Sequence, residues 1–294
     1  MGDHSKIEWT DATWNPVTGC TRVSEGCRNC YMARTVPRQG QDPWTVVLHP
    51  DRINQPLQWR KPRRIFVNSL SDLFHEDVPD EFIERVFQVM YKADQHTFQL
   101  LTKRPERMLD WISRSSYLCN APIPNVWLGV SIENQETADE RIQILLQTPA
   151  AVRFVSAEPL LGVVDFHSIK SERGYYDLMY RYGPGLFDRQ SRRICDAKID
   201  WVICGGESGP GARPCDVAWI RSIVQQCKWA GVPCFVKQLG SKPFSEADHI
   251  SHKANAQKME NGFYRFLNDR KGGNWDEWPE DLRVREFPTK GAPG

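Results

Sequence analysis

The chain has 294 residues, of which 40% are hydrophobic and 26% are charged. This composition excludes a disordered chain and predicts a globular protein with a sizeable core. The net charge of +1 excludes a global field that attracts nucleic acid or anionic lipid, so such a partner would have to meet a local patch.

The segments that would direct the chain to a membrane or out of the cell are not apparent. No stretch approaches the run of about 18 apolar residues that spans a bilayer, and the first residues lack the apolar run of a signal peptide. Nine cysteines without an export signal are typical of a reducing compartment, where thiols are free or bind metal. We therefore expect a cytoplasmic protein.

Short apolar runs recur along the chain and predict strands. The first strand is expected over residues 12–17, and six more runs follow at intervals of about 25 to 35 residues, apart from one wider gap. These six runs are residues 64–67, 98–101, 126–130, 152–155, 201–204 and 233–236. Such strands, separated by helical patterns, are typical of βαβ units in a parallel sheet.

Amphipathic patterns between the runs predict the helices. Asp80 is suited to cap one helix, and Pro105 suits the first position of the next. Asn134 and Asp216 open two more helices, and Gly231 follows the last one as a C-terminal cap. About seven β/α units result. They predict an α/β fold, a complete or partial TIM-type barrel formed by residues 1–294 as a single domain.

Two segments depart from the β/α pattern. Residues from about 166 to 199 fill the wide gap and are rich in tyrosine and arginine, which indicates an insertion on one loop. This insertion is either a lid or partner surface, or a solvated excursion without a role. The extension from about 241 to 294 ends in Trp275, Trp278 and Phe287, which predict a strap packed back onto the barrel.

Three cysteines near the N-terminus are the strongest chemical signal. Cys20, Cys27 and Cys30 have the spacing C-x6-C-x2-C, and Gly26 gives the backbone freedom to bring Cys20 beside the other two. The C-x2-C pair lets two thiolates reach one metal from a single tight turn. Three thiolates from one loop suit a [4Fe–4S] cluster with one iron open to a substrate or cofactor.

Two other interpretations of these cysteines stay open. A structural zinc site needs a fourth ligand, for which the chain offers His4, His49 or a distant cysteine. Three unligated core cysteines are the other interpretation, although the polar, glycine-flanked local sequence disfavours it.

The cysteine loop, placed after the first strand of a barrel, resembles the radical S-adenosylmethionine superfamily. The best-known spacing in that superfamily is C-x3-C-x2-C, and this chain lengthens the first interval by three residues. Residues 7–20, 205–209 and 278–283 also resemble a phage- and prophage-encoded three-Cys-motif family that has no settled activity. The resemblance implies a [4Fe–4S] cluster and S-adenosylmethionine as cofactors, together with an electron donor.

Polar residues follow the predicted strands at the end where barrel enzymes hold their active sites. Charged groups directly after buried runs are costly unless they are paired or face a wet cleft. The pattern therefore predicts either a binding site or a ring of Glu–Lys pairs and helix caps that closes the top of the barrel. The residues at these strand ends are Asn68, Ser69, Asp72, Lys103, Ser131, Glu133, Glu158, Gly205, Gly206 and Glu207.

The resemblance suggests a role for each of these positions. The position expected for the contact to the cofactor's amino group is held by Asn68, Ser69 and Asp72. Further candidates for cofactor binding are Ser131, Gly205 and Gly206. Candidates for catalysis are Lys103, Glu133, Glu158 and Glu207. The run 205–207 resembles the Gly-Gly-Glu of many radical enzymes, but it follows a late strand here, so it contacts either the cofactor or the substrate.

The resemblance implies an enzyme that cleaves S-adenosylmethionine reductively and abstracts a hydrogen atom from its substrate through a 5′-deoxyadenosyl radical. The sequence leaves the substrate, the hydrogen-atom donor and the oligomeric state open. A nucleic-acid component is one candidate, because the strand pattern also resembles DNA repair enzymes of the spore-photoproduct-lyase type. The basic residues at 61–64, at 103–104 and near 190 would then form either a local phosphate track or a solvated basic face. The alternative function is a non-catalytic protein, stabilised by zinc or an iron–sulfur cluster, that binds nucleic acid or docks a partner.

Overall fold

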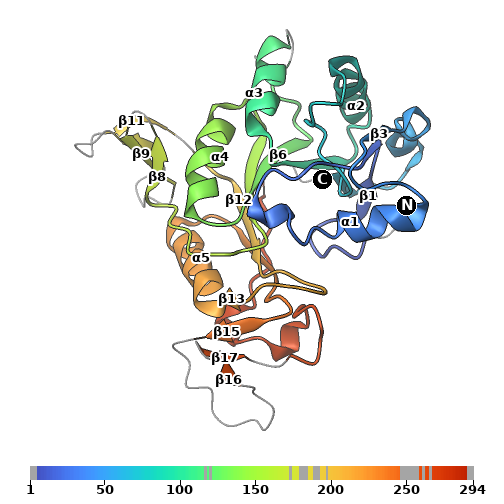
Figure 1. The fold of residues 1–294 in the computed structure, drawn as a ribbon. Helices are drawn as coiled ribbons and strands as arrows, with labels where there is room; N and C mark the ends of the chain where they lie inside the picture. Colours follow the sequence, from blue (N-terminus) through green and yellow to red (C-terminus); the bar gives the residue numbers. More distant parts are fainter. Residues whose placement is uncertain are drawn as a thin grey trace. The chain divides into compact units, whose positions relative to one another are not determined.

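A seven-stranded sheet forms the centre of the computed structural model, which describes residues 5–115, 118, 121–171, 174–178, 185–187, 193–196, 198–245, 258–259, 262–264 and 267–289. The strand order is β1-β4-β5-β6-β7-β12-β14 (Figure 1). The strands are β1 (Ala12–Trp14), β4 (Arg64–Val67), β5 (Thr97–Thr102), β6 (Val126–Ile132), β7 (Val152–Ala157), β12 (Trp201–Gly205) and β14 (Cys234–Gln238). Their order follows the chain and their described pairs are parallel. The predicted α/β fold is confirmed, in its partial TIM-type form.

The chain divides into two compact units. The first comprises Met1–Ser131, Ile144–Phe154 and Pro288–Gly294, and the second comprises Ile132–Gln143 and Val155–Phe287. The expectation of a single domain over residues 1–294 stays a prediction.

In the first unit, the parallel strands are held in register. Ala12 pairs with Ile65, Ile65 pairs with Phe98, and Phe98 pairs with Val126. All four side chains are buried, as expected for strands of a parallel sheet that is covered on both faces. Because the strands run in the same direction, their carboxyl ends lie along one edge.

Two helices of the first unit pack their apolar faces inward. They are α2 (Asp80–Lys92) and α3 (Pro105–Arg114). Pro105 is the first residue of α3, as predicted, since its fixed φ suits that position and its missing N–H costs nothing there. The cap predicted at Asp80 is wrong, because Pro79 holds that position. The Asp80 carboxylate instead accepts hydrogen bonds from Arg107 at 3.1 Å and Arg114 at 3.0 Å.

The strand expected over residues 12–17 is two strands. β1 ends at Trp14, and β2 (Val17–Thr18) pairs antiparallel with β3 (Val47–Leu48). Pro16 lies between them and has no N–H for a sheet ladder, so the chain leaves the central sheet at this point. The short helices that follow are η1 (Glu25–Cys27), α1 (Met32–Thr35), η2 (Val36–Gln39), η3 (Pro50–Arg52) and η4 (Gln55–Gln58).

The remaining two predicted helices form where expected. Asn134 precedes α4 (Gln135–Gln147), and its side-chain oxygen accepts a hydrogen bond from the Thr137 N–H at 3.0 Å. In the second unit, the Asp216 side chain caps α5 (Val217–Ala230) by accepting from the Ala218 N–H at 2.9 Å. Gly231 ends α5 in the left-handed conformation, with φ of 70°. Every helix in the described residues is too short or too polar to span a bilayer.

The insertion at about 166–199 contains a small sheet of its own. Its strands are β8 (Ile169–Ser171), β9 (Gly174–Asp177), β10 (Gly185–Phe187) and β11 (Arg193–Asp196), paired antiparallel in the order β11-β10-β9-β8. The sequence pattern missed these strands because it contains no sustained apolar alternation. Several of the tyrosines and arginines that marked the insertion, namely Tyr180, Tyr182, Arg189 and Arg192, lie outside the described residues.

The predicted C-terminal strap is present in the second unit. Phe287 packs against Trp201, with 5.4 Å between ring centroids, and Trp278 is 2% exposed. The backbone N–H of Val236 in β14 donates to the Val284 carbonyl at 2.9 Å, so the strap lies along this strand. Before the strap, β13 (Cys215–Asp216), β15 (Pro243–Ser245), β17 (Gly262–Tyr264) and β16 (Lys258–Met259) form another sheet, and η5 (Trp275–Glu277) and η6 (Glu280–Leu282) belong to the strap itself.

Candidate metal centre and strand-end site

The cysteine loop begins at a tightly fixed point of the first unit. The Gly19 N–H donates to the Leu70 carbonyl at 3.1 Å, and the Cys20 N–H donates to the Pro43 carbonyl at 3.0 Å. Gly19 has φ of 83°, and a Cβ there would lie 1.9 Å from the Thr45 carbonyl oxygen. Only glycine satisfies both conditions, so the residue before Cys20 is dictated by the backbone.

The three thiols belong to the loop that follows Gly19 in the first unit. All three are half-buried, and Cys20 and Cys30 pack against the core residues Met32, Val36 and Leu70. Burial raises the pKa of Cys20 to about 11 and also raises the pKa of Cys30, and the Cys27 thiol adds to both shifts. In the part of the chain that the structure describes, no three His, Cys, Asp or Glu side chains converge closely enough to hold a metal ion.

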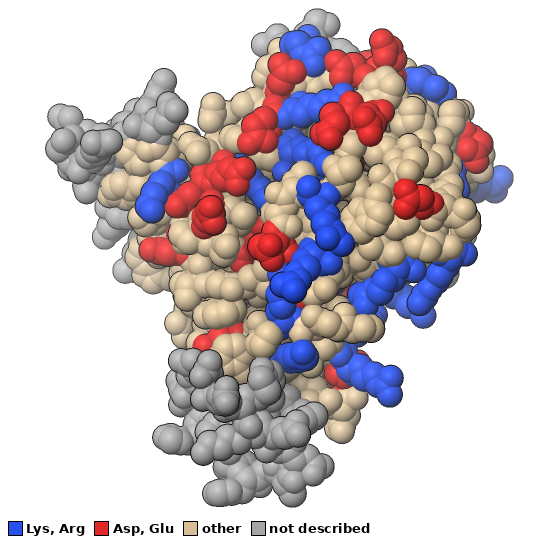
Figure 2. Space-filling view, in the orientation of Figure 1, with Lys and Arg blue, Asp and Glu red and all other residues tan. Residues whose placement is uncertain are grey.

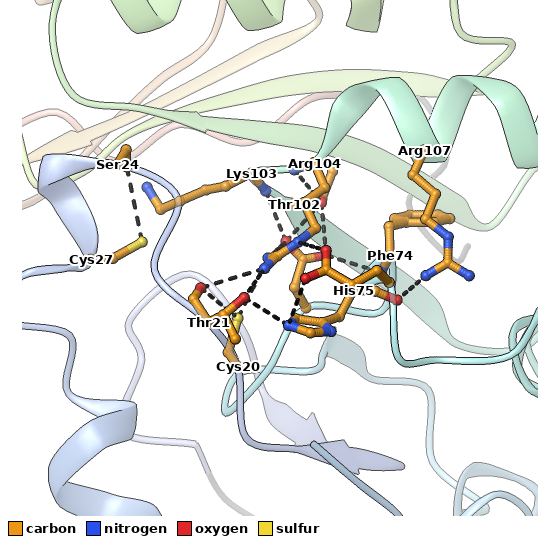
Figure 3. Close-up of polar contacts among 12 residues, drawn as sticks. Cys20, Thr21, Ser24, Cys27, Phe74, His75, Thr102, Lys103, Arg104 and Arg107 are labelled. Carbon is orange, nitrogen blue, oxygen red and sulfur yellow. Dashed lines mark hydrogen bonds and ion pairs between the residues drawn. The ribbon is translucent and has the colours of Figure 1, made fainter. Parts of the chain in front are cut away.

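Arg104 connects the cysteine loop to the strand ends (Figure 3). It follows β5 and is 9% exposed. Its guanidinium donates to Cys20 Sγ at 3.5 Å and to Thr21 Oγ1 at 2.7 Å, and it also meets the Asp72 carboxylate at 3.5 Å. The positive charge of Arg104 lowers the pKa of Cys20 against the larger effect of burial. A single cation therefore faces a candidate metal ligand and a strand-end carboxylate.

Asp72 receives the strongest set of donors in this network. Thr102 Oγ1 donates to its two oxygens at 2.8 and 2.9 Å, and the Lys103 N–H donates at 3.0 Å. The Phe74 N–H donates to Oδ1 at 3.0 Å. These contacts hold the loop after β4 against the end of β5, which is the edge predicted to carry the site.

His75 is tied into the same network. Its Nδ1 accepts from the Asp77 N–H at 3.1 Å, so the proton lies on Nε2, which is 2.8 Å from Thr21 Oγ1. Burial, followed by the nearby Arg104 charge, lowers the pKa of His75. The neutral imidazole therefore supports Thr21 from one side, while Arg104 supports it from the other.

Asn68 shows the combination of strain and unmet polarity that marks binding sites. It follows β4 with φ of 57°, the one positive φ at a non-glycine residue among the described residues. It is 2% exposed, and both its amide oxygen and its amide nitrogen lack a hydrogen-bond partner among the described residues. A buried amide without partners costs about 1–3 kcal/mol, and a ligand at this strand end would remove that cost.

Ser69 lies beside Asn68 and joins the cysteine loop directly. Its hydroxyl is 3.2 Å from the side-chain amide of Asn15, and its carbonyl accepts a hydrogen bond from the Tyr31 hydroxyl. Tyr31 follows Cys30, so this contact connects the third cysteine to the end of β4. Lys103 also approaches the loop, because its charge lowers the pKa of Cys30 against the effect of burial. Ser131 is 6% exposed near the end of β6.

The second unit holds its strand-end carboxylates in ion pairs. Glu133 lies 3.2 Å from Arg141, and the two side chains are 2% and 3% exposed. Glu207 accepts from Arg213 at 2.7 Å and 3.0 Å and from the Arg213 N–H at 2.8 Å. The alternative expected from the sequence was a ring of Glu–Lys pairs and helix caps, whereas the partners of Glu133 and Glu207 are arginines. The roles of these glutamates stay a prediction.

Glu158 is placed differently from the other two glutamates. Its Oε1 lies 3.3 Å from Lys237 Nζ but has no hydrogen-bond partner among the described residues. A Cβ at Gly205 would lie 3.0 Å from this oxygen, and a Cβ at Gly206 would lie 2.3 Å from the Leu239 carbonyl oxygen. The two glycines are therefore required for close packing of the backbone beside Glu158.

The described side chains of the suggested basic track do not form one surface, and those of the arginines near 190 lie outside the described residues. Lys61 and Arg63 precede β4 and Arg64 begins it, whereas Lys103 and Arg104 follow β5. These two strands are parallel neighbours, so the two groups lie at opposite ends of the sheet. Arg64 also forms an ion pair with Asp11, with 3.1 Å between Nη2 and Oδ1.

The described residues offer the zinc interpretation no group of three or more His, Cys, Asp or Glu side chains that could hold the ion. His49 Nε2 lies 2.8 Å from Thr18 Oγ1, and His4 and Cys119, a distant cysteine, lie outside the described residues. The sequence placed Arg104 among the polar residues after its strand and in a phosphate track, but it did not connect Arg104 with the cysteine loop. Arg104 lies between the end of β5 at Thr102 and the start of α3 at Pro105, and this position was the available signal for a strand-end role.

Comparison with solved structures finds two of spore photoproduct lyase. A mutant of that enzyme matches with 15% identity and a TM-score of 0.44, covering 94% of this chain and 74% of the other. Its complex with a dinucleoside spore photoproduct matches with 14% identity and a TM-score of 0.38, covering 89% and 70%. Neither likeness is close enough to transfer a substrate or a reaction. No curated protein matches the chain. A family model matches residues 4–271, and the chain therefore belongs to the family described as "Protein of unknown function (DUF5131)".

Proposed function

We propose that this protein is a radical S-adenosylmethionine enzyme in which Cys20, Cys27 and Cys30 hold a [4Fe–4S] cluster. One observation carries the proposal. The loop with these three thiols is attached to the carboxyl ends of β4 and β5 through Tyr31 and Arg104. Chemistry in β/α-barrel enzymes takes place at this edge of the sheet.

The residue types present fit such a group, although the structure does not bring the three thiols together around one metal position. Three half-buried thiols from one loop would leave one iron of the cluster without a protein ligand. Burial raises the pKa of Cys20 and Cys30, and the positive charges of Arg104 and Lys103 oppose this rise at Cys20 and Cys30 respectively. Metal binding commonly completes the folding of its own ligand loop, and closure of residues 20–30 around the cluster is part of the proposal.

The remaining residues of the first unit would bind and orient the second cofactor. The buried amide of Asn68 offers both a donor and an acceptor to the amino and carboxylate groups of S-adenosylmethionine. Ser69 and Asp72 shape the same strand end, and Ser131 lies near the end of β6. When bound, the cluster and S-adenosylmethionine would supply a one-electron cleavage that generates a hydrogen-abstracting radical.

In the second unit, Glu158 and Lys237 are the pair best suited to contact substrate, because Glu158 keeps an oxygen without a hydrogen bond among the described residues. Gly205 and Gly206 allow the backbone to approach this pair closely. The arginine partners of Glu133 and Glu207 favour a positioning role for these two carboxylates. We also propose a cytoplasmic, phage-related setting and a substrate that contains a nucleic-acid component.

The test is anaerobic reconstitution of the full chain with iron and sulfide. The proposal predicts a brown protein with about four irons and, after reduction with S-adenosylmethionine, formation of 5′-deoxyadenosine. Cys27→Ala should lose both the iron and the product, whereas Cys215→Ala, which removes a buried thiol of the second unit, should keep both. Tightly bound zinc without colour would instead support the non-catalytic alternative. A fully loaded cluster that yields no 5′-deoxyadenosine would refute the enzymatic proposal.

A further inference from the structure

The surface of residues 20–45 carries unpaired positive charge. Four arginines lie on this segment, three of them exposed and one half-buried: Arg22, Arg28, Arg34 and Arg38. None of the four forms an ion pair with any residue that the structure describes. Elsewhere in the same unit, Arg64 and Arg114 lie against carboxylates at 3.1 and 3.0 Å. Figure 2 shows Lys and Arg side chains gathered around the position that Figure 1 gives to α1.

The same surface exposes large apolar side chains. Among the described residues, the exposed large hydrophobic side chains include Val23, Tyr31 and Trp44, which are 43%, 44% and 39% exposed. The Arg22 guanidinium lies 4.6 Å from the centroid of the Trp44 ring. An exposed arginine stacked on an exposed indole offers planar faces to a nucleobase and a charge to the adjacent phosphate.

This surface is continuous with the candidate site. Tyr31 follows Cys30 directly and donates a hydrogen bond to the Ser69 carbonyl at the end of β4. Trp44 follows Pro43, whose carbonyl accepts from the Cys20 N–H at 3.0 Å. Tyr31 is therefore next in sequence to Cys30, and Trp44 is next to a residue that hydrogen-bonds to Cys20.

We propose that residues 20–45 bind single-stranded nucleic acid, with Trp44 and Tyr31 stacking on bases and the four arginines contacting phosphates. Stacking requires bases that are not already paired, so the surface suits a single strand better than a duplex. An acidic peptide would satisfy the arginines but would leave the aromatic rings without a planar partner. Delivery of a nucleotide to the cysteine site rests on the proposed function, whereas binding of the strand does not.

The experiment measures binding by fluorescence anisotropy with the full chain, before and after iron reconstitution. The probes are a labelled 12-nucleotide single-stranded DNA, the RNA of the same sequence, the corresponding DNA duplex and a polyglutamate peptide. We expect at least one single strand to bind more tightly than the duplex and the peptide. The DNA and RNA arms identify which strand is preferred.

Variants separate stacking from charge. Trp44→Ala should weaken single-strand binding by about 5- to 150-fold, the range expected for one stacked base, and Trp44→Phe should restore most of it. Replacing Arg22 and Arg28 with glutamine should reduce the salt slope by about 0.7 for each lost phosphate contact. The matched controls Tyr91→Ala and Arg60→Gln alter an exposed ring and an exposed cation elsewhere in this unit and should leave binding unchanged.

Two results would overturn the proposal. One is equal binding of single strand, duplex and polyglutamate, which would indicate attraction to charge alone. The other is a Trp44→Ala variant that melts at the wild-type temperature and binds at the wild-type level. Strand binding by a protein that retains no iron would leave this proposal standing while the proposed enzymatic function fails, so the two failures are distinguishable.

Discussion

The strand ends of the two units carry similar polar side chains and use them in different ways. In the second unit, Glu133 and Glu207 are each matched by an arginine on the same segment of chain. In the first unit, Asn68 has two buried polar atoms without partners among the described residues, and Arg104 reaches across to a separate loop. Matched charges stabilise a fold, whereas unmatched polarity at a strand end indicates a ligand. This difference supports the proposal that Asn68 contacts the cofactor, while Glu158 of the second unit, which also keeps an oxygen without a hydrogen bond among the described residues, is proposed to contact substrate.

The largest effect is expected from removing Arg141. Arg141→Met leaves the buried Glu133 carboxylate without its cation and should lower the free energy of unfolding by about 3–5 kcal/mol, measured by urea denaturation. The double variant with Glu133→Gln should recover most of this loss, because it removes the uncompensated charge. Iron bound per folded molecule should not change in either variant. If folded Arg141→Met protein bound less iron than folded wild type, the Glu133–Arg141 pair would contribute to the metal site. The contrast drawn between the two units would then be wrong.

A smaller effect on stability, with a specific effect on the loop, is expected from Arg104→Gln. The loss of charged hydrogen bonds to Thr21 and Asp72 should cost about 1.5–3 kcal/mol. The loop of residues 20–30 should become more sensitive to limited proteolysis and should retain less iron after reconstitution. Arg85→Gln, which removes a cation stacked on Phe82 at 5.9 Å, is the control and should change neither property. Unchanged proteolysis in the Arg104 variant would show that the loop is held by other contacts.

Asn68 allows backbone strain and ligand contact to be separated. Asn68→Gly keeps the left-handed conformation at little cost, so its stability should stay within about 1 kcal/mol of wild type, whereas Asn68→Ala should lose about 1–2 kcal/mol. Both variants remove the amide and should weaken binding of S-adenosylmethionine, by about tenfold for one lost contact of 1.4 kcal/mol. Equilibrium dialysis on reconstituted protein measures this. Wild-type affinity in both variants would exclude Asn68 from the cofactor site.

The smallest expected effect is on how the free energy of unfolding falls at acid pH. It is caused by His96, which lies in the first unit away from the strand ends. His96 is fully buried, and burial, together with the nearby Arg63 charge, lowers its pKa. A histidine whose pKa is lowered on folding binds more protons when unfolded, so its contribution to stability is present above the unfolded pKa of about 6.5 and falls as the pH drops below that value. His96→Gln should flatten the fall in unfolding free energy between pH 7 and pH 5. An equally steep fall in this variant would assign the effect to other groups.

Most of the central fold follows from local sequence patterns. The runs at 64–67, 126–130 and 201–204 all lie within strands of the sheet, because β-branched and apolar residues there are buried from both sides. The single strand expected over 12–17 failed at Pro16, since the pattern gave more weight to apolar residues than to the missing N–H. The strands of the insertion were missed because short antiparallel strands depend on their partners more than on their own sequence.

The site was predicted less completely than the fold. The cysteines were evident from their spacing, and the neighbourhood of Asp72 followed from its place after a strand. Arg104 was not assigned to the loop, because a contact across 84 positions to Cys20 leaves no local pattern. The pairing of Glu207 with Arg213 was also missed, although only six positions separate them. The glycines between them give no pattern from which the turn that joins the two residues could be predicted.

The fixed backbone around Gly19 has a consequence for how such loops can vary. The carbonyls of Thr45 and Leu70 restrict the backbone where the chain enters the loop. At its exit, Cys27 ends the short helix η1, and the Cys30 N–H donates to the Cys27 carbonyl at 3.3 Å. Residues 21–24 connect these two anchors without belonging to a helix or strand. We therefore expect insertions and deletions to be tolerated within residues 21–24 and to disrupt the loop next to Gly19 or Cys27. Two relatives with different numbers of residues between the first two cysteines could thus keep the same sulfur positions in space.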